Sequence, residues 1–347
     1  MHTMNAIINS FLYKEALMKL LFVFTGGTIG SSISGDYIST DKNKPHLLLE
    51  SYKARYGLSA DYDVTQPYTK LSENNNGKTF RTLASAIEPY LSNAYDGILV
   101  MHGTDTLQYT AAALSYAFGD CATPVCLVSS NYPIEDSRAN GLTNLHAAIC
   151  FISQSHKSGV WVSYQNQHEL PKIHRASRLL AGQAFTDNIY SIFDSYFGSF
   201  DESWHFHANP AFSQTEDQIA PLPYKYLEQT CDTILRIESY PGMSYPPIGS
   251  NINCILHGSF HSGTINTDLS SYREFFQTAY KKGIPVYLTG TPCGTSYEST
   301  KLFSELHIRP LMGISPVAAY MKLWMASSAG LSVDAIMNHS LGGDIIY

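Results

Sequence analysis

The stretch GILVMHGTDT, residues 97–106, decides how this chain folds. Its first half is a short apolar run without charge, which is typical of a strand buried on both faces of a parallel sheet. Its second half is small and polar, and a helical pattern follows over residues 107–118. Because ligands bind beyond the carboxyl ends of strands in open parallel sheets, the loop at 102–106 is a candidate functional site.

Other segments repeat this strand–loop–helix pattern along the chain. Apolar runs bounded by turn residues predict further strands, and a second helical pattern covers residues 142–155. Alternation at this spacing predicts an α/β fold with a parallel sheet. The further predicted strands in these runs lie at residues 20–24, 125–129, 159–163, 253–256 and 285–288.

A change in composition divides the chain. Residues 205–231 carry prolines and many polar residues without a clean period, so they are predicted to be a linker. The linker separates an N-terminal α/β domain at 18–204 from a smaller C-terminal α/β domain at 232–347. The smaller domain is predicted to hold a strand at 233–239 and helices at 269–282 and 315–328. Residues 1–17 are predicted to be an N-terminal extension.

Composition excludes several classes of function. The 347 residues carry a formal net charge of −7 and are 44% hydrophobic, as in ordinary globular proteins. The acidic balance argues against a nucleic-acid-binding surface, and no apolar run is long enough to span a membrane. The cysteines are scattered and lack the spacing of a metal site, which predicts reduced thiols in a cytoplasmic protein with no metal or other cofactor.

A second loop, TGGTIG at residues 25–30, follows the first predicted strand. Its glycines permit tight turns and close approach of a ligand, and a threonine hydroxyl there can be a nucleophile if a neighbour accepts its proton. Two other interpretations of this loop arise when it is taken alone. It is also compatible with a plain strand-to-helix turn, whereas a phosphate loop would need a Gly-Lys-Ser/Thr that is missing. Taken alone, Thr104–Asp105–Thr106 equally fits an N-cap for the next helix.

Together, and in this order, the two loops resemble those of the bacterial L-asparaginase family. Residues 131–145 and 240–243 are similar to later segments of that family. Residues 315–324 are similar to the last helix of its cytoplasmic, type I branch. The resemblance implies an asparaginase-like fold and a homodimer or homotetramer in which paired subunits complete each site.

The resemblance also implies catalytic roles. Thr28 matches the nucleophile that attacks a side-chain amide, and Tyr37 matches the tyrosine on a lid that helps to activate it. Thr104 matches the second threonine, which activates water through a lysine. These roles imply hydrolysis of L-asparagine or a related amide to L-aspartate and ammonia through a threonine acyl-enzyme, without a metal.

Substrate-binding roles follow from the same resemblance. Asp105 matches the carboxylate that pairs with the α-ammonium group of the amino acid, a charge-assisted contact that gives strong orientation. Ser72 and Glu73 match the pair that grips the α-carboxylate and α-amino groups.

The family lysine has no counterpart here. The family pattern Arg-x-x-Arg-x-x-Lys reads Arg175, Arg178 and Ala181, and Lys172 lies on the wrong side of it. One interpretation is that another group supplies the base. His261, in a loop of the C-terminal domain, is a candidate, although the pattern favours an ordinary hydrogen-bonded loop histidine.

A second interpretation is a catalytically impaired protein that binds or senses amino acids on an asparaginase scaffold. A third is the asparaginase-like subunit of a tRNA-dependent amidotransferase, which carries the same two loops. That protein keeps the lysine, however, and the acidic charge of this chain does not suit tRNA.

Overall fold

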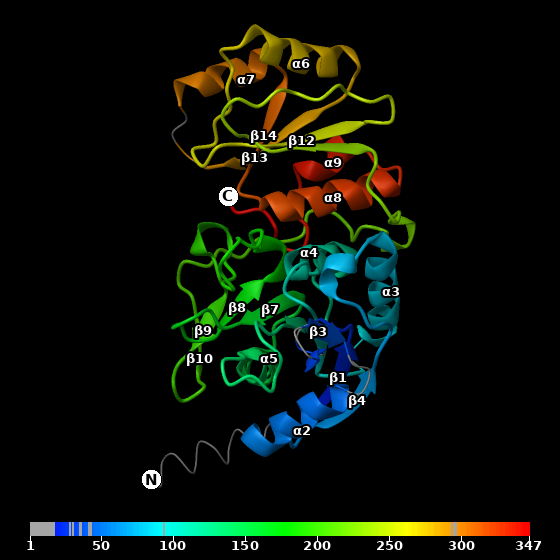
Figure 1. Cartoon of the computed structure of the whole chain (residues 1–347), viewed down its shortest axis with the longest axis vertical. Helices are drawn as coiled ribbons and strands as arrows, with labels where there is room; N and C mark the ends of the chain where they lie inside the picture. Colours follow the sequence, from blue (N-terminus) through cyan, green and yellow to red (C-terminus); the bar gives the residue numbers. More distant parts are fainter. Residues whose placement is uncertain are drawn as a thin grey trace.

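Two sheets, one above the other in Figure 1, organise the chain. The computed structural model describes residues 18–27, 29, 31–34, 37–40, 44–92, 94–292, 294 and 297–347; residues 31–34, 37–40, 44 and 45 are described by their backbone alone. The predicted extension at residues 1–17 lies outside this description. No helix of the described chain is long and apolar enough to cross a membrane.

The first sheet has the strand order β10-β9-β8-β7-β6-β5-β1-β4. Strands β4, β1, β5, β6 and β7 run parallel, and β8 to β10 extend the sheet as antiparallel strands. A mainly parallel α/β sheet was predicted, and the structure confirms it. The eight strands are β1 (Lys19–Phe24), β4 (Asp61–Thr65), β5 (Gly97–Met101), β6 (Val125–Val128), β7 (Val160–Tyr164), β8 (Lys172–Arg175), β9 (Gly198–Phe200) and β10 (Phe206–Ala208).

Helices cover both faces of this sheet. Alternate residues of each strand point to opposite faces. Leu21 of β1 therefore packs in one core with α3 and α4, while Phe22 packs in another with α2 and α5. This two-sided burial explains why the predicted strands are continuously apolar. The helices are α2 (Lys44–Tyr56), α3 (Gly77–Ile87), α4 (Leu107–Phe118) and α5 (Gly141–Ser155).

The second sheet is parallel and has the order β11-β12-β13-β14. Helices α6 and α7 lie on its outer face, and α8 and α9 lie between the two sheets (Figure 1). We call each sheet with its helices a unit. Helix α8 of the second unit packs against α4 of the first, so one core is shared by the two units. The elements are β11 (Ile234–Ile237), β12 (Cys254–Gly258), β13 (Val286–Thr291), β14 (Ile308–Met312), α6 (Ser270–Lys281), α7 (Leu302–Glu305), α8 (Pro316–Ser328) and α9 (Val333–Met337).

The segment predicted to be a linker begins inside the first sheet. Strand β10 pairs with β9, and the ring of Phe206 packs against Phe197 and Phe200. Farther along, Leu227 is buried in the core shared by the two units. A few buried apolar side chains thus attach this segment to the rest of the molecule. Its many prolines and polar residues hide that property from an interpretation based on composition. A hairpin of β2 (Ser31–Ser34) and β3 (Tyr37–Thr40) was not predicted.

Candidate functional site

Three loops meet at the carboxyl ends of β1 and β5. Gly26 and Gly27 have φ of +101° and +74°, a conformation that glycine adopts without strain. A side chain at Gly27 would overlap the backbone of Gly103, and one at Gly103 would overlap the side chain of Ser72. The loop before Thr28, the loop carrying Thr104 and the turn at Ser72 are thus in direct contact, as expected if the two sequence motifs form one site.

Hydrogen bonds fix the Asp105 loop on the Ser72 turn. The Ser72 hydroxyl donates to Asp105 Oδ2 at 3.2 Å, and Thr106 Oγ1 donates to the Ser72 carbonyl at 2.9 Å. Asn75 Nδ2 donates to Thr106 Oγ1 at 3.1 Å. Ser72 is buried whereas Asp105 is exposed, so the carboxylate is held from below while its outer face is open to a ligand.

The alternative that this loop only caps a helix accounts for part of the structure. Thr106 does occupy the N-cap position of α4, but its side chain makes no capping hydrogen bond. Its hydroxyl is instead directed to the Ser72 carbonyl. Thr106 therefore joins two loops, and the free backbone amides at the start of α4 are left without a side-chain cap from it.

His102 forms the floor beneath these loops. It is fully buried, with Nδ1 donating to the Gly103 carbonyl at 2.7 Å. Its Nε2 accepts from Thr110 Oγ1 at 2.9 Å and from the Asn75 amide at 3.2 Å. This arrangement requires a neutral ring, and burial lowers the pKa of His102 to about 4. His102 is therefore a structural support rather than an acid–base group at neutral pH.

A cavity of about 390 Å³ opens beside Thr104 and Asp105. One wall comes from Thr104, Asp105, Gln108 and Tyr109 at the start of α4, and the other from segment 180–189. Ala181 lies on that second wall and is exposed. The described residues that line the cavity include no lysine, arginine or histidine.

The two arginines that precede Ala181 face away from this cavity. Arg175 Nε donates to the Gly342 carbonyl, and Arg178 Nε donates to the Gly343 carbonyl, each at 2.8 Å. Both side chains are buried, and burial followed by the neighbouring Arg175 charge lowers the pKa of Arg178 to about 10. Arg178 thus remains a cation at neutral pH, and its task is to hold the C-terminal tail.

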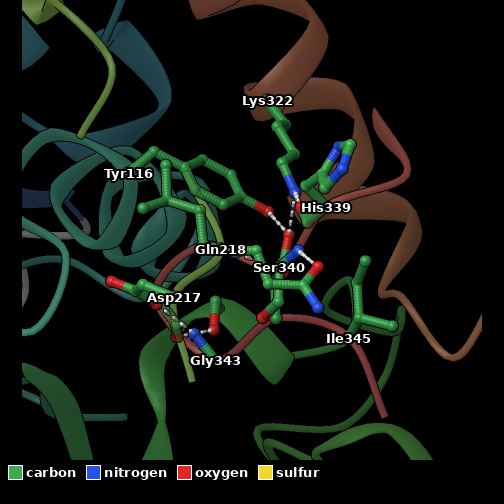
Figure 2. Close-up of polar contacts among 12 residues, drawn as sticks. Tyr116, Asp217, Gln218, Lys322, His339, Ser340, Gly343 and Ile345 are labelled. Carbon is green, nitrogen blue, oxygen red and sulfur yellow. Dashed lines mark hydrogen bonds and ion pairs between the residues drawn. The ribbon is translucent and has the colours of Figure 1, made fainter. Parts of the chain in front are cut away.

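That tail is anchored by a buried ion pair. Figure 2 shows Tyr116 and Lys322 directed at the tail between Ser340 and Ile345. Lys322 Nζ lies 2.8 Å from Asp344 Oδ2, and the Tyr116 hydroxyl donates to the same oxygen at 2.9 Å. The side chains of Lys322 and Asp344 have no exposed surface. We call the contacts of the tail with Arg175, Arg178, Tyr116 and Lys322 the tail clasp.

The remaining predicted residues are placed as follows. Thr28 lies outside the described residues, and Tyr37 begins β3 but its side chain is not described. Glu73 is exposed in the short 3-10 turn Ser72–Asn74, next to Ser72. His261 is exposed in the turn after β12 and is not part of the cavity lining.

Sequence reasoning missed several residues that build this site. Asn75 supports the Asp105 loop and Tyr109 lines the cavity, while His102 lies in the predicted loop but was given no role of its own. The pattern around Tyr109 is that of a helix, and nothing in it distinguishes a cavity residue from a surface tyrosine. The wall at 180–189 has no periodic signal at all, because it is irregular chain.

Comparison with protein families supports the predicted family. A model described as "Asparaginase, N-terminal" matches residues 19–209, more than half of the chain. The chain belongs to the asparaginase family. L-asparaginase 1 of Escherichia coli is 30% identical to this family member over 135 residues, covering 38% of this chain and 39% of that protein. A glutamyl-tRNA(Gln) amidotransferase subunit of Sulfolobus acidocaldarius is 25% identical, covering 95% of this chain and 76% of that protein.

Solved structures agree with the fold of this asparaginase-family chain. L-asparaginase I of Vibrio cholerae superposes with a TM-score of 0.75 at 21% identity, covering 95% of this chain and 99% of that chain. The thermostable L-asparaginase of Thermococcus kodakarensis gives 0.74 at 22% identity, covering 95% and 100%. The predicted family and fold are confirmed. The match to an archaeal amidotransferase means that the narrower bacterial, type I assignment stays a prediction.

Proposed function

We propose that this chain hydrolyses L-asparagine or a related amide to L-aspartate and ammonia. The observation that carries the proposal is the contact between the glycine loop that precedes Thr28 and the loop that carries Thr104 and Asp105, beside an open cavity. The Thr28 oxygen bonds to the amide carbon and ammonia leaves with the hydroxyl proton. Water then breaks the acyl bond, releasing the acid and restoring the Thr28 hydroxyl.

Substrate binding is assigned to the exposed polar face of the same loops. Asp105 is open to a ligand and is positioned by Ser72, so it suits the α-ammonium group of an amino acid. Glu73, exposed beside Ser72, adds a second negative charge for that group. Backbone amides of the glycine-rich loops are the proposed donors to the oxyanion.

Ammonia release tests this proposal. Purified chain is expected to release ammonia from asparagine, glutamine or a short β- or γ-amide near neutral pH. The Thr28→Ala variant removes the nucleophilic hydroxyl and is expected to lose that activity while its melting temperature is unchanged. Release of no ammonia from any of these amides, or undiminished release by Thr28→Ala, would overturn the proposal.

Ala181 favours a second candidate, an amino-acid-binding or sensor protein on the same scaffold. The cavity wall at that position offers a methyl group, and the described lining carries no basic side chain. Titration calorimetry separates the two candidates. A sensor binds an amino acid with saturable heat and releases no ammonia, whereas the proposed enzyme does both at matched substrate concentrations.

A third candidate follows from the similarity to the amidotransferase of Sulfolobus acidocaldarius, which extends over 95% of this chain. In that case the chain would liberate ammonia for transfer within a complex. The prediction is ammonia release that is weak in the isolated chain and increases when a copurifying partner is restored. The net charge of −7 still argues against tRNA binding by this chain itself.

We also propose that the protein is cytoplasmic and forms a homodimer or homotetramer. His261 is exposed on the second unit. In such an oligomer, we propose that His261 of one copy reaches the cavity beside Thr104 of a neighbouring copy. Sedimentation velocity tests the oligomeric state. A His261→Gln variant tests whether this side chain supplies a base, since a general base contributes roughly 10²–10⁴-fold in rate.

A further inference from the structure

Tyr109 lines the cavity on the wall that carries Thr104. Tyr109 belongs to the first turn of α4, five residues after Thr104, and both line the cavity opposite Ala181. Its side chain is half-buried. The described lining contains other hydroxyls and carboxylates, but Tyr109 is the one whose hydroxyl is bonded to the second structural unit.

The second unit holds this tyrosine in place. Arg236 Nη1, from β11, donates to the Tyr109 hydroxyl oxygen at 3.2 Å. The ring of Tyr320 on α8 meets the Tyr109 ring edge to face, with centroids 6.2 Å apart and planes at 88°. Such aromatic pairs are favourable beyond the area they bury. Tyr109 is therefore oriented by contacts from two elements of the other unit.

Arg236 is itself held by Glu238. The guanidinium group donates to Glu238 Oε1 through Nε at 3.0 Å, and Nη2 lies 2.9 Å from the same oxygen. It also lies 5.8 Å from the centroid of the Tyr320 ring. A planar guanidinium with a fixed fork keeps its remaining N–H groups in one direction. Glu238 thereby directs Nη1 of Arg236 to Tyr109.

The direction of the hydrogen bond from Arg236 determines which further hydrogen bonds the Tyr109 hydroxyl can make. A guanidinium has donors only, so the phenolic oxygen accepts in this bond and its own proton is free for another partner. Among the described residues, the bond to Arg236 is the hydrogen bond that Tyr109 makes through its hydroxyl. The Tyr109 hydroxyl can thus give one proton and accept another on its second lone pair.

We propose that Tyr109, positioned by Arg236, is the proton-relay group that serves Thr104 where position 181 offers only a methyl group. This inference rests on the proposed amide hydrolysis. When water adds to the acyl carbon and the bond to the Thr28 oxygen breaks, the proton of that water must reach the Thr28 oxygen. The Thr104 and Tyr109 hydroxyls, directly or through one cavity water, each receive one proton and give one, and both end unchanged.

The key test compares Tyr109→Phe with the wild-type chain. The ring and its packing against Tyr320 remain, so only the hydroxyl is lost. We expect kcat for ammonia release to fall by about 10²-fold, the lower end for loss of a positioned acid–base group, while KM and the melting temperature change little. Arg236→Met is expected to lower kcat by about tenfold through mispositioning, and Arg236→Lys to restore part of that loss. Tyr226→Phe, at an exposed tyrosine, is the matched control.

A rescue experiment adds a readout that a purely structural role would not give. In Tyr109→Phe/Ala181→Lys the new lysine amine replaces the relay, and we expect kcat to recover over Tyr109→Phe alone by clearly more than the roughly tenfold gain expected from Ala181→Lys in the wild-type chain. A Tyr109→Phe kcat within threefold of the wild type would overturn the inference and leave the proposed function standing. An inactive wild-type chain would overturn both.

Discussion

The tail clasp and the cavity beside Thr104 lie at opposite ends of the same short segment, residues 175–181. At one end, Arg175 and Arg178 are buried and bonded to the tail carbonyls. At the other end, Ala181 is exposed on the wall of an open cavity. Within this one segment, the two buried arginines are fixed by their contacts with the tail. The residue at position 181 is exposed, so its identity can change with the reaction in the cavity.

This difference explains a partial match of sequence motifs. Both arginines of the Arg-x-x-Arg-x-x-Lys pattern have a role in the fold: they connect segment 175–181 to the C-terminal tail and do not line the cavity. The third position of the pattern, Ala181, is exposed and lines the cavity. The arginines are thus evidence for the fold, and they carry no information about turnover.

Breaking the clasp should have the largest effect on stability. Asp344→Ala leaves the Lys322 ammonium buried without its partner, which typically costs about 3–5 kcal/mol of the free energy of unfolding. Urea unfolding followed by circular dichroism measures this loss. The double variant Lys322→Met/Asp344→Leu removes both charges and should be less destabilised than Asp344→Ala. A loss below about 1 kcal/mol in Asp344→Ala would contradict the account of the clasp.

Low pH should reduce the free energy of unfolding through His102, which lies beneath the loops of the candidate site. The pKa of His102 falls from its usual 6.5 to about 4 in the folded chain, so the unfolded state binds more protons between these values. Stability is therefore lost as pH falls from about 6.5 towards 4, by about 2 kcal/mol at pH 5 from this group. The difference in unfolding free energy between pH 7 and pH 5 should shrink by that amount in His102→Gln. An unchanged pH dependence would show that His102 is not buried as a neutral ring.

The fold was largely predictable from particular runs of sequence. The strand at 97–101 and the helix at 107–118 were predicted with the bounds of β5 and α4, because a doubly covered parallel strand must be continuously apolar. Strands β8 to β10 and β14 were missed, since they are short and their sequences, KIHR, GSF, FHA and IRPLM, are not continuously apolar. The contact of Phe206 with Phe200 lies in a segment that composition marks as a linker.

The candidate site was predictable only where it coincides with a motif. The loops at 25–27 and 102–106 were identified and do meet, because strands β1 and β5 are neighbours in a parallel sheet. Tyr109 and Arg236 come from different units, and their hydrogen bond depends on how α4 packs beneath β11 and α8. No local pattern encodes such a contact.

Changing the free end of the segment should affect turnover rather than stability. Ala181→Lys places an ammonium on the cavity wall facing Thr104, and we expect kcat for ammonia release to rise by about tenfold, equivalent to about 1.4 kcal/mol of activation free energy. Because Ala181 is exposed, the free energy of unfolding should change by less than about 0.5 kcal/mol. A lower free energy of unfolding in Ala181→Lys with an unchanged kcat would contradict the proposed difference between the two ends of segment 175–181.

The smallest effect is expected at an exposed ion pair outside both regions. Arg138 is 66% exposed where it pairs with Asp136 at 2.7 Å. Exposed pairs contribute roughly 0–1 kcal/mol, so Arg138→Ala should lower the free energy of unfolding by no more than that amount, with ammonia release retained. A loss as large as that of Asp344→Ala would show that the degree of burial does not distinguish these ion pairs.

The kcat of Thr104→Val, measured by ammonia release beside the wild-type chain, tests the account most directly. Valine keeps the shape of threonine and removes the hydroxyl of a residue that lines the cavity beside Tyr109 and opposite Ala181. We predict a loss of about 10²–10⁴-fold in kcat at an unchanged melting temperature. A Thr104→Val chain that hydrolyses the amide within threefold of the wild-type rate would contradict the claim that this cavity is where the reaction takes place.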